Sequence, residues 1–278
     1  MPVAIERRSA FTWIRALPHL LPAAPLADAA IKPTVDRAAA AGLAELQRAR
    51  RACGGEWACY RPVSAPVESD ALARCAGETR WMEAAVVDLS RGAEDARRRM
   101  DRKTRQDVAR TRAHGVTYEE RADALEEAYA LHVRQARAWS AHRPLPRELS
   151  RRLLDQGVAQ LLIARDAGGL LCATLALDSP RETFLWWSGA HPGARAAEAY
   201  PGLMWWAAER AAGRGRARLN LGASRGIEPL ERFKRSLGAT AIRYPVRWLD
   251  ASAAPPLGRL LAAAQRWRRR GRARGSAA

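Results

Sequence analysis

The spacing of apolar positions changes repeatedly between two periods over residues 79–250, and each period predicts one kind of element. Short runs rich in apolar or β-branched residues predict strands over residues 81–89, 116–120, 159–165, 170–177 and 183–188. Apolar positions three and four apart predict helices over residues 122–139, 146–156 and 201–212. Strands that alternate with helices in this order indicate an α/β fold with a mixed sheet.

The pattern is weaker before residue 79. Residues 1–34 are rich in Pro and Ala and predict irregular structure with at most one short helix, whereas residues 36–52 predict a helix that stops at Gly54–Gly55. A short strand is expected over residues 57–62. We therefore divide the chain into a reduced N-terminal segment, a lobe and a basic C-terminal tail, at residues 1–78, 79–250 and 251–278.

Residues 219–239, LNLGASRGIEPLERFKRSLGA, combine several structural signals. Leu219 to Leu221 predict the end of a buried strand, and the small residues after them predict a turn at Gly222, Ser224 and Gly226. Pro229 suits the first turn of a helix, and Gly238 suits its end. The stretch therefore predicts a strand, a tight turn and a short helix.

Helical spacing puts a lysine on the apolar side of this short helix. Leu230, Phe233 and Leu237 share one face at about 100° per residue, and Lys234 falls on the same face. A buried charge is costly without a partner or a cleft, so Lys234 either reaches out at the helix edge or serves a site. Among 47 Lys and Arg residues, lysine occurs only at positions 32, 103 and 234, which favours a specific role for this ammonium.

These residues resemble a known family. A strand, a glycine turn and a helix with an Arg-Phe-Lys triplet at residues 232–234, closing on Leu-Gly-Ala, are similar to the last conserved block of FemABX-type transferases of the GNAT acyltransferase superfamily. The resemblance extends upstream through residues 86–89, the basic helix near Arg105 and the strand start at residues 115–116. It implies a GNAT-like acyltransferase fold over about residues 79–250, with a reduced N-terminal lobe.

The resemblance also implies where the chemistry takes place. In the GNAT fold two parallel strands splay apart and the acyl donor enters between them. Here these strands correspond to residues 183–188 and 216–221, and the helix that starts at Pro201 would direct free N–H groups at a pyrophosphate. By resemblance, Lys234 is the catalytic cation that stabilises a tetrahedral oxyanion, and Phe233 shapes the site. The substrate-binding candidates are Lys103, Arg105, Trp187, Arg195, Tyr200 and Ser224.

Positive charge dominates the composition. The formal net charge is +18 and the pI is about 11.2, which favours anionic partners such as RNA, acidic lipid or acidic polysaccharide. Residues 90–114 predict one basic helix, capped by Ser90 and ended by Gly115, whose cations either form a solvated face or bind a polyanionic substrate. The tail combines an apolar stripe with arginines over residues 257–274, which suits an anionic membrane, RNA or a plain C-terminal helix.

Other kinds of site are not indicated. The cysteines form no CxxC pair and have no histidines at zinc spacing, so we expect no metal site and interpret as reduced thiols Cys53, Cys59, Cys75 and Cys172. No run approaches the ~18 apolar residues of a spanning helix, and prolines interrupt the signal-like stretch at residues 11–30. No Ser-His-Asp or Cys-His arrangement predicts a covalent intermediate, and His132 is either a packed histidine or a base.

Together these observations predict acyl transfer to an amine or hydroxyl of a cell-envelope or polysaccharide precursor. The loop over residues 190–202 lacks the Arg/Gln-x-x-Gly-x-Gly/Ala pattern of GNAT enzymes that use acetyl-CoA, so we expect no tightly bound cofactor and a donor that is either aminoacyl-tRNA or acyl-CoA. The alternative is a non-catalytic, degenerate GNAT lobe that binds RNA or anionic membrane. We expect a cytoplasmic protein, with peripheral contact at the inner membrane face through its tail.

Overall fold

The computed structural model describes residues 4–8, 11–15, 57–60 and 77–249, apart from residues 112, 139–143, 145, 146, 196 and 225. The chain divides into two compact units, one made of Met1–Met82 with Tyr244–Ala278 and the other of Glu83–Arg243. The helix expected over residues 36–52 and the basic tail lie outside the described residues. The division at residues 78 and 250 stays a prediction.

The first unit holds a hairpin where irregular structure was expected. Strands β1 (Ala4–Arg8) and β2 (Phe11–Arg15) pair antiparallel, with Ala4 opposite Arg15 and Arg8 opposite Phe11. The expectation of irregular structure over residues 1–34 is therefore wrong for this part. Aromatic and β-branched residues in β2 favour a strand, and the Pro- and Ala-rich composition around them hid this local preference. In the same unit, β3 (Trp57–Tyr60) pairs antiparallel with residues 246–249.

The second unit holds most of a mixed sheet in the order β3-β10-β4-β9-β8-β7-β6-β5, of which β3, the start of β4 and the end of β10 belong to the first unit. The strands are β4 (Gly77–Asp88), β5 (Thr117–Glu120), β6 (Ala159–Asp166), β7 (Gly169–Asp178), β8 (Glu182–Ala190), β9 (Arg218–Asn220) and β10 (Thr240–Leu249). Strands β5 to β8 form consecutive antiparallel pairs, and β4 pairs antiparallel with β9. In contrast, β8 and β9 run parallel. The predicted mixed α/β sheet is confirmed.

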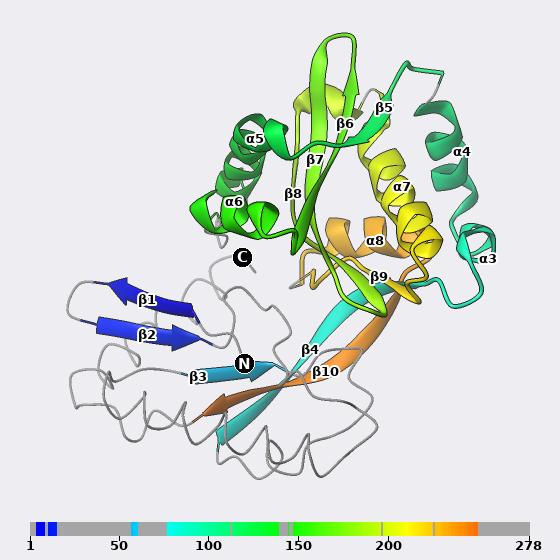
Figure 1. Ribbon diagram of the computed structural model, residues 1–278. Helices are drawn as coiled ribbons and strands as arrows, with labels where there is room; N and C mark the ends of the chain where they lie inside the picture. The colour runs from blue at the N-terminus through cyan, green and yellow to red at the C-terminus, as the bar shows by residue number, and fades with distance from the viewer. Residues whose placement is uncertain are drawn as a thin grey trace, which may run out of the picture. The chain divides into compact units, whose positions relative to one another are not determined.

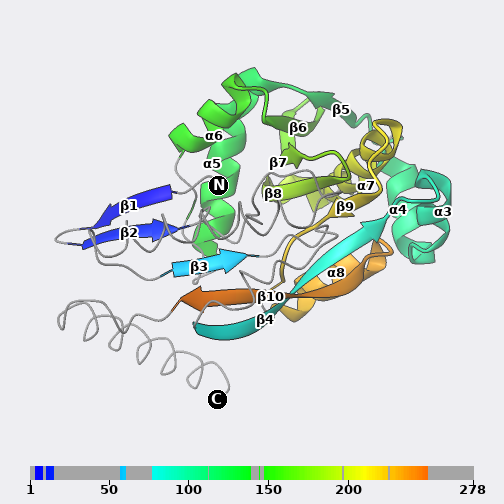
Figure 2. The ribbon, with the colours of Figure 1, turned by 60° about the horizontal axis from the view of Figure 1, so that its bottom comes forward.

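Helices cover both faces of this sheet (Figures 1 and 2). Helices α5 (Leu125–Ala138) and α6 (Arg147–Asp155) lie on one side, and α3 (Ala93–Arg98), α4 (Arg102–Thr111) and α7 (Ala199–Gly213) lie on the other. Helix α8 (Glu228–Ser236) shares a hydrophobic cluster with α7 through Phe233 and Leu237. Because both faces are covered, β7 is buried without interruption from Leu170 to Ala176. None of the described helices is long and apolar enough to cross a bilayer.

The basic segment over residues 90–114 is two helices and not the single helix that its pattern predicts. Helix α3 ends at Arg98 and α4 begins at Arg102. The guanidinium of Arg105 donates to the backbone oxygens of Arg98 and Met100, at 3.1 and 2.6 Å. The N–H of Asp101 donates to the carbonyl of Ser236 at the end of α8, at 2.9 Å. Tertiary contacts therefore create the break, because no Pro or Gly stands at residues 99–101.

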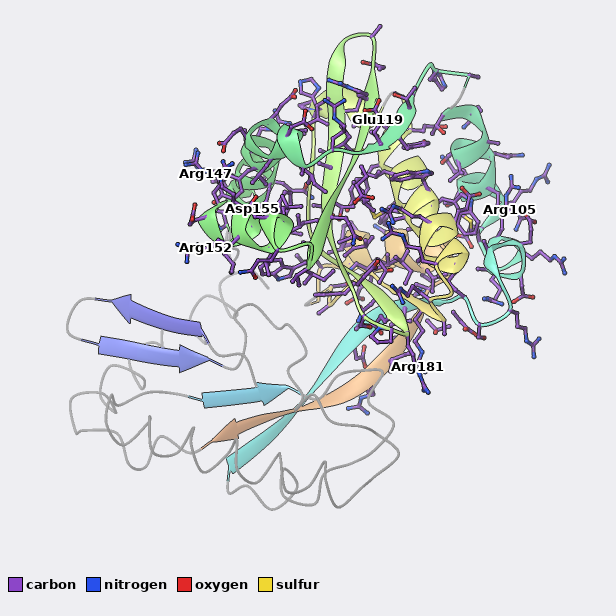
Figure 3. The ribbon with its side chains drawn as sticks, viewed as in Figure 1. Arg105, Glu119, Arg147, Arg152, Asp155 and Arg181 are labelled. Carbon is purple, nitrogen blue, oxygen red and sulfur yellow. The ribbon has the colours of Figure 1, made fainter. Side chains whose placement is uncertain are left out.

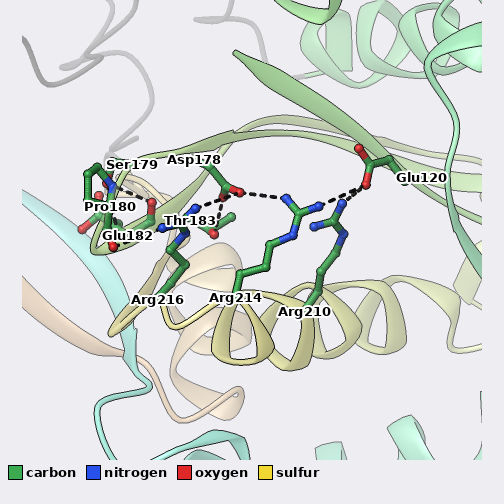
Figure 4. Close-up of polar contacts among 9 residues, drawn as sticks. All are labelled: Glu120, Asp178, Ser179, Pro180, Glu182, Thr183, Arg210, Arg214 and Arg216. Carbon is green, nitrogen blue, oxygen red and sulfur yellow. Dashed lines mark hydrogen bonds and ion pairs between the residues drawn. The ribbon is translucent and has the colours of Figure 1, made fainter. Parts of the chain in front are cut away.

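A network of charges joins the end of α7 to β5, to the end of β7 and to the start of β8 (Figure 4). Arg210 pairs with Glu120 of β5, and Arg214 lies between Glu120 and Asp178, at 3.7 and 3.0 Å. The Asp178 carboxylate also accepts a 2.5 Å hydrogen bond from the hydroxyl of Thr183 and pairs with Arg216 at 3.8 Å. The network therefore fixes the end of β8 at which the parallel pairing with β9 begins.

Replacing Asp178 by alanine is expected to lower the free energy of unfolding by about 1–3 kcal/mol, because two arginines and a threonine lose a nearly buried acceptor. Urea unfolding followed by circular dichroism measures the change. The matched control is Asp155→Ala, which removes an exposed carboxylate on α6 (Figure 3) and is expected to stay within about 0.5 kcal/mol of the native protein. Equal effects of the two substitutions would show that the network contributes nothing.

Candidate functional site

Strand β9 pairs with β8 over its whole length, but only with the first three residues of β8. Glu182, Thr183 and Phe184 lie opposite Arg218, Leu219 and Asn220, respectively, and there the pairing ends. Strand β9 stops at Asn220, whereas β8 continues to Ala190. The parallel pairing therefore ends at Phe184 and Asn220, where the GNAT resemblance predicts that the two strands separate. We call this separation the splay and its closed end the vertex.

Side chains of α5 form hydrogen bonds with carbonyl groups of β8 along the splay. Gly189 lies opposite Ala173, and the N–H of His191 donates to Leu171 at 2.7 Å, so Ser188 and Ala190 direct their backbone groups away from β7. The carbonyl of Ser188 is 3.1 Å from Nδ1 of His132. The carbonyl of Ala190 accepts a 2.7 Å hydrogen bond from Arg134. The N–H groups of Ser188 and Ala190 point the same way as these carbonyls.

A bulge in β8 turns two successive tryptophans towards the same helices. The register with β7 shifts between Leu175 and Ala176, which leaves Trp186 without an opposite residue. Both Trp186 and Trp187 belong to the hydrophobic cluster on the α5 side of the sheet. The indole of Trp187 donates to the hydroxyl of Ser150 at 3.2 Å and stacks on His132. Trp187 therefore lies on the face opposite α7, away from Lys234, and we do not include it in the proposed site.

Three polar groups are linked by hydrogen bonds at the vertex. The side-chain amide of Asn220 donates to the carboxyl of Glu182 at 3.0 Å, and its oxygen accepts the N–H of Gly222 at 2.8 Å. Burial raises the pKa of Glu182, and the hydrogen bond from Asn220 opposes this shift. Gly222 has a positive φ of 72°, which glycine adopts without strain. These contacts hold the chain in the turn from which α8 begins.

Lys234 lies at the vertex and is buried. The residue is 6% exposed, and its Nζ donates to the carbonyl of Gly222 at 2.9 Å. The same carbonyl accepts the N–H of Ala85 at 3.0 Å. Desolvation lowers the pKa of Lys234 from 10.5 to about 8, and the charge of Glu231 opposes the shift. The interpretation of Lys234 as a cation that reaches out to solvent at the helix edge is therefore wrong.

Phe233, the residue before Lys234, lies against the ring of Tyr200 at the start of α7. The ring centroids of Phe233 and Tyr200 are 5.3 Å apart, with an angle of 34° between the planes. Burial raises the pKa of Tyr200 to about 12, although a hydrogen bond with Ser188 of β8 opposes the shift. The hydroxyl of Ser188 in turn donates to Thr174 at 3.0 Å. The structure therefore brings Phe233 and Tyr200 together, with Tyr200 bonded to Ser188 of β8.

The start of α7 differs from the expectation of a helix that opens at Pro201 and presents free N–H groups. Helix α7 begins at Ala199, and Glu198 before it has a positive φ of 52°. The Glu198 carboxylate pairs with Arg110 of α4, at 2.9 and 3.2 Å. Pro201 has no N–H, and the N–H of Gly202 bonds back to Glu198 at 3.4 Å. An acidic side chain therefore stands where an anionic group of a ligand would have to bind.

The remaining predicted substrate residues are dispersed. Ser224 lies in the turn before α8, where its carbonyl accepts the N–H of Ile227 at 3.0 Å. Lys103 is exposed and pairs with Asp107 at 2.6 Å. Figure 3 shows Arg105 at the outer edge of the unit, where α3 meets α4. Arg195 ends the short helix η2 (Pro192–Arg195), and its side chain lies outside the described residues.

The sequence analysis did not identify two residues of the vertex, Asn220 and Glu182. Asn220 stands between Leu219 and Leu221, and a polar residue inside a buried strand is an informative signal. Glu182, which accepts its hydrogen bond, comes from a distant part of the chain and carries no such signal. No group of three or more metal-binding side chains occurs in the part of the chain that the structure describes.

Comparison with solved structures finds the same fold in proteins of low sequence identity. A structure of FemX is 10% identical, covers 87% of this chain and 83% of its own, and has a TM-score of 0.62. The C-terminal domain of a putative lysylphosphatidylglycerol synthetase from Agrobacterium fabrum is 15% identical over 95% of this chain and 84% of its own, with a TM-score of 0.58. A conserved protein of unknown function from Bacteroides thetaiotaomicron is 14% identical over 76% and 75%, with a TM-score of 0.53.

The family comparison agrees with the fold. No curated protein matches the chain. Residues 94–235, just over half of the 278 residues, match the family described as acetyltransferase (GNAT) domain. The resemblance to the GNAT superfamily is confirmed by this match, and the fold is shared with FemX. The chain belongs to the family of GNAT acetyltransferase domains.

Proposed function

We propose that the protein is an acyltransferase of the FemABX type that transfers an acyl group to an amine or hydroxyl of a cell-envelope or polysaccharide precursor. The observation that carries this proposal is the buried ammonium of Lys234 at the vertex of the splay. A GNAT acyltransferase fold holds its donor between the splayed strands, and a fixed cation at their vertex faces the place where negative charge develops. The names of FemX and of the putative lysylphosphatidylglycerol synthetase support the class of reaction and of acceptor.

In this proposal the nucleophile of the acceptor attacks the acyl carbon and forms a tetrahedral oxyanion. Lys234 stabilises the oxyanion, since a group with a pKa of about 8 is mainly charged at pH 7. One of its three N–H donors binds Gly222, so others remain for the oxyanion. Phe233 and Tyr200 exclude water, which strengthens the interaction between the charges.

We further propose that the donor is not a coenzyme A thioester but an ester such as an aminoacyl-tRNA. The ion pair of Glu198 with Arg110 occupies the start of α7, where a pyrophosphate would otherwise bind. His132 and Arg134 already occupy two carbonyl groups of β8 that the amides of pantetheine would otherwise bind. A net charge of +18 favours a polyanionic donor.

Acetyl-CoA is therefore expected to bind more weakly than the micromolar range in a calorimetric titration. The variant Glu198→Gln, which removes the carboxylate and keeps the shape, is expected to bind acetyl-CoA more tightly than the native protein does. Heat from a single site of micromolar affinity in the native protein would overturn this donor assignment. A screen of charged tRNAs, acyl-CoA donors and amine or hydroxyl acceptors by mass spectrometry tests the reaction itself, and an absence of any product would remove the proposed function.

The second candidate is a binding module without catalysis, and the exposed cations of α3 and α4 favour it. Arg98, Arg102 and Lys103 are exposed, although the tail with which they would act lies outside the described residues. Such a module would bind RNA or anionic vesicles with an affinity that falls steeply as salt is added. Binding of this kind without any acyl transfer would favour the module over the enzyme.

A further inference from the structure

His132 holds a buried nitrogen that the proposed reaction has not used. It lies on α5, and its Nδ1 is 3.1 Å from the carbonyl oxygen of Ser188. A carbonyl oxygen only accepts hydrogen bonds, so Nδ1 carries a proton and donates it. In the neutral ring this contact fixes the tautomer, and Nε2 carries a lone pair.

The surroundings of His132 keep its ring neutral. The residue is 8% exposed, and Nε2 is buried without a hydrogen-bond partner. Burial lowers the pKa of His132 from 6.5, and the contact with Ser188 only partly opposes the shift. The titratable or charged neighbours are Tyr129, whose ring centroid is 6.0 Å away, and Arg134, which binds Ala190. From β8, Trp187 stacks on the ring at 4.8 Å and brings no charge.

Two further buried atoms on the same side of the sheet lack partners. They are Oε1 of Gln135, which lies one turn of α5 beyond His132, and Nε1 of Trp186 at the bulge of β8. Nearly all buried polar atoms in proteins are hydrogen-bonded, so three unpaired atoms on packed neighbouring elements need an explanation. One donor and two acceptors suit a ligand that offers N–H or O–H groups together with a carbonyl or hydroxyl oxygen.

We propose that the acceptor substrate binds on the α5 side of β8 and that Nε2 of His132 takes the proton from its attacking amine or hydroxyl, an inference that rests on acyl transfer being the reaction. Gln135 and Trp186 hold neighbouring polar groups of the same acceptor.

The step balances without a further reagent. The attacking nitrogen or oxygen forms a bond to the acyl carbon and gives its proton to Nε2. The bond between the acyl carbon and the donor oxygen breaks, and the leaving group keeps the electron pair and takes up a proton from water. His132 returns its proton to water and is ready for the next turnover.

Two substitutions separate proton transfer from packing. His132→Asn places an amide N–H near Nδ1, so it keeps the contact with Ser188 but lacks Nε2, whereas His132→Phe loses both. We expect both variants to lose about 10²–10⁴ in kcat/KM, with a normal melting temperature for the Asn variant only. The native enzyme is expected to lose kcat/KM as pH falls below the lowered pKa of His132, and the Asn variant is expected to lack this decline. An Asn variant that retains both the stability and the activity of the native protein would overturn the proposal.

A measurement without turnover keeps this inference distinct from the proposed function. Nitrogen NMR of the five histidines, with His132 assigned by its absence in the Asn variant, reports the protonated nitrogen and the pKa. A neutral ring at pH 7 with the proton on Nδ1 supports the proposal. A proton on Nε2, or a charged ring at pH 7, overturns it even if acyl transfer is found. If no donor is turned over, the proposed function itself fails.

Discussion

Replacing Lys234 by methionine is expected to lower kcat/KM by about 10²–10³ while the protein remains folded. Methionine has a similar length and no charge, so it fills the buried space at the vertex and removes only the ammonium. The carbonyl of Gly222 keeps the N–H of Ala85 as a donor, so no backbone group is left unpaired. Rates with the donor and acceptor found by screening, together with a thermal unfolding curve, measure the two effects.

The exposed Arg235→Met is the matched control, because it removes a cation from the next position of the same helix. It is expected to keep nearly all activity. Lys234→Arg is expected to restore activity only in part, since a planar guanidinium does not fit the space of a compact ammonium. Near-normal turnover of the methionine variant would make Lys234 a structural residue that joins α8 to Gly222.

The lowered pKa of Lys234 predicts how both activity and stability depend on pH. Stabilisation of an oxyanion needs the charged form, so activity is expected to fall as pH rises through about 8. The unfolded chain holds this proton up to about pH 10.5, so between pH 8 and 10.5 the unfolded state binds more protons and stability rises with pH. The penalty for the buried charge is on the order of 3 kcal/mol below pH 8. The methionine variant is therefore expected to be more stable than the native protein below pH 8. Its stability is expected not to rise between pH 8 and 10.5.

Local signals in the sequence account for the order of elements and for the position of Lys234. The alternation of periods predicts the strands β4 to β8 and the helices α5, α6 and α7 with small shifts at their ends. Helical spacing places Lys234 on the face of Leu237, and both side chains are buried in the structure. The small residues after β9 predict the turn in which Gly222 has a positive φ. These features depend on neighbours within a few positions.

Features that depend on distant contacts were not predicted. The break between α3 and α4 needs Asp101 to meet the end of α8, and no residue at the break records that contact. The pairing of Glu182 with Asn220 joins positions 38 residues apart. The strand over residues 183–188 was expected to end before Gly189, yet β8 continues through it to Ala190. A glycine in a strand marks close approach by another backbone, and here that backbone is α5.

Replacing Gly189 by alanine is therefore expected to destabilise the protein by about 3 kcal/mol or more. A methyl group at this position would lie 2.4 Å from the backbone nitrogen of His132 and 2.6 Å from the carbonyl carbon of Leu131. Neither atom belongs to a flexible side chain, so α5 itself would have to move away from β8. Urea unfolding of the purified variant measures the loss, and little soluble protein at 37 °C is the expected result in cells.

The control for this effect is Gly213→Ala at the end of α7, where an added methyl group meets no atom within 4 Å. It is expected to be neutral or to stabilise by up to about 1 kcal/mol, because alanine favours a helix. Where the Gly189 variant still folds, the shift of α5 also lengthens the contacts that His132 and Arg134 make with β8. Its activity is then expected to fall by more than its unfolded fraction explains. A Gly189 variant as stable as the Gly213 variant would mean that α5 lies further from β8, and the placement of His132 at the splay would fail with it.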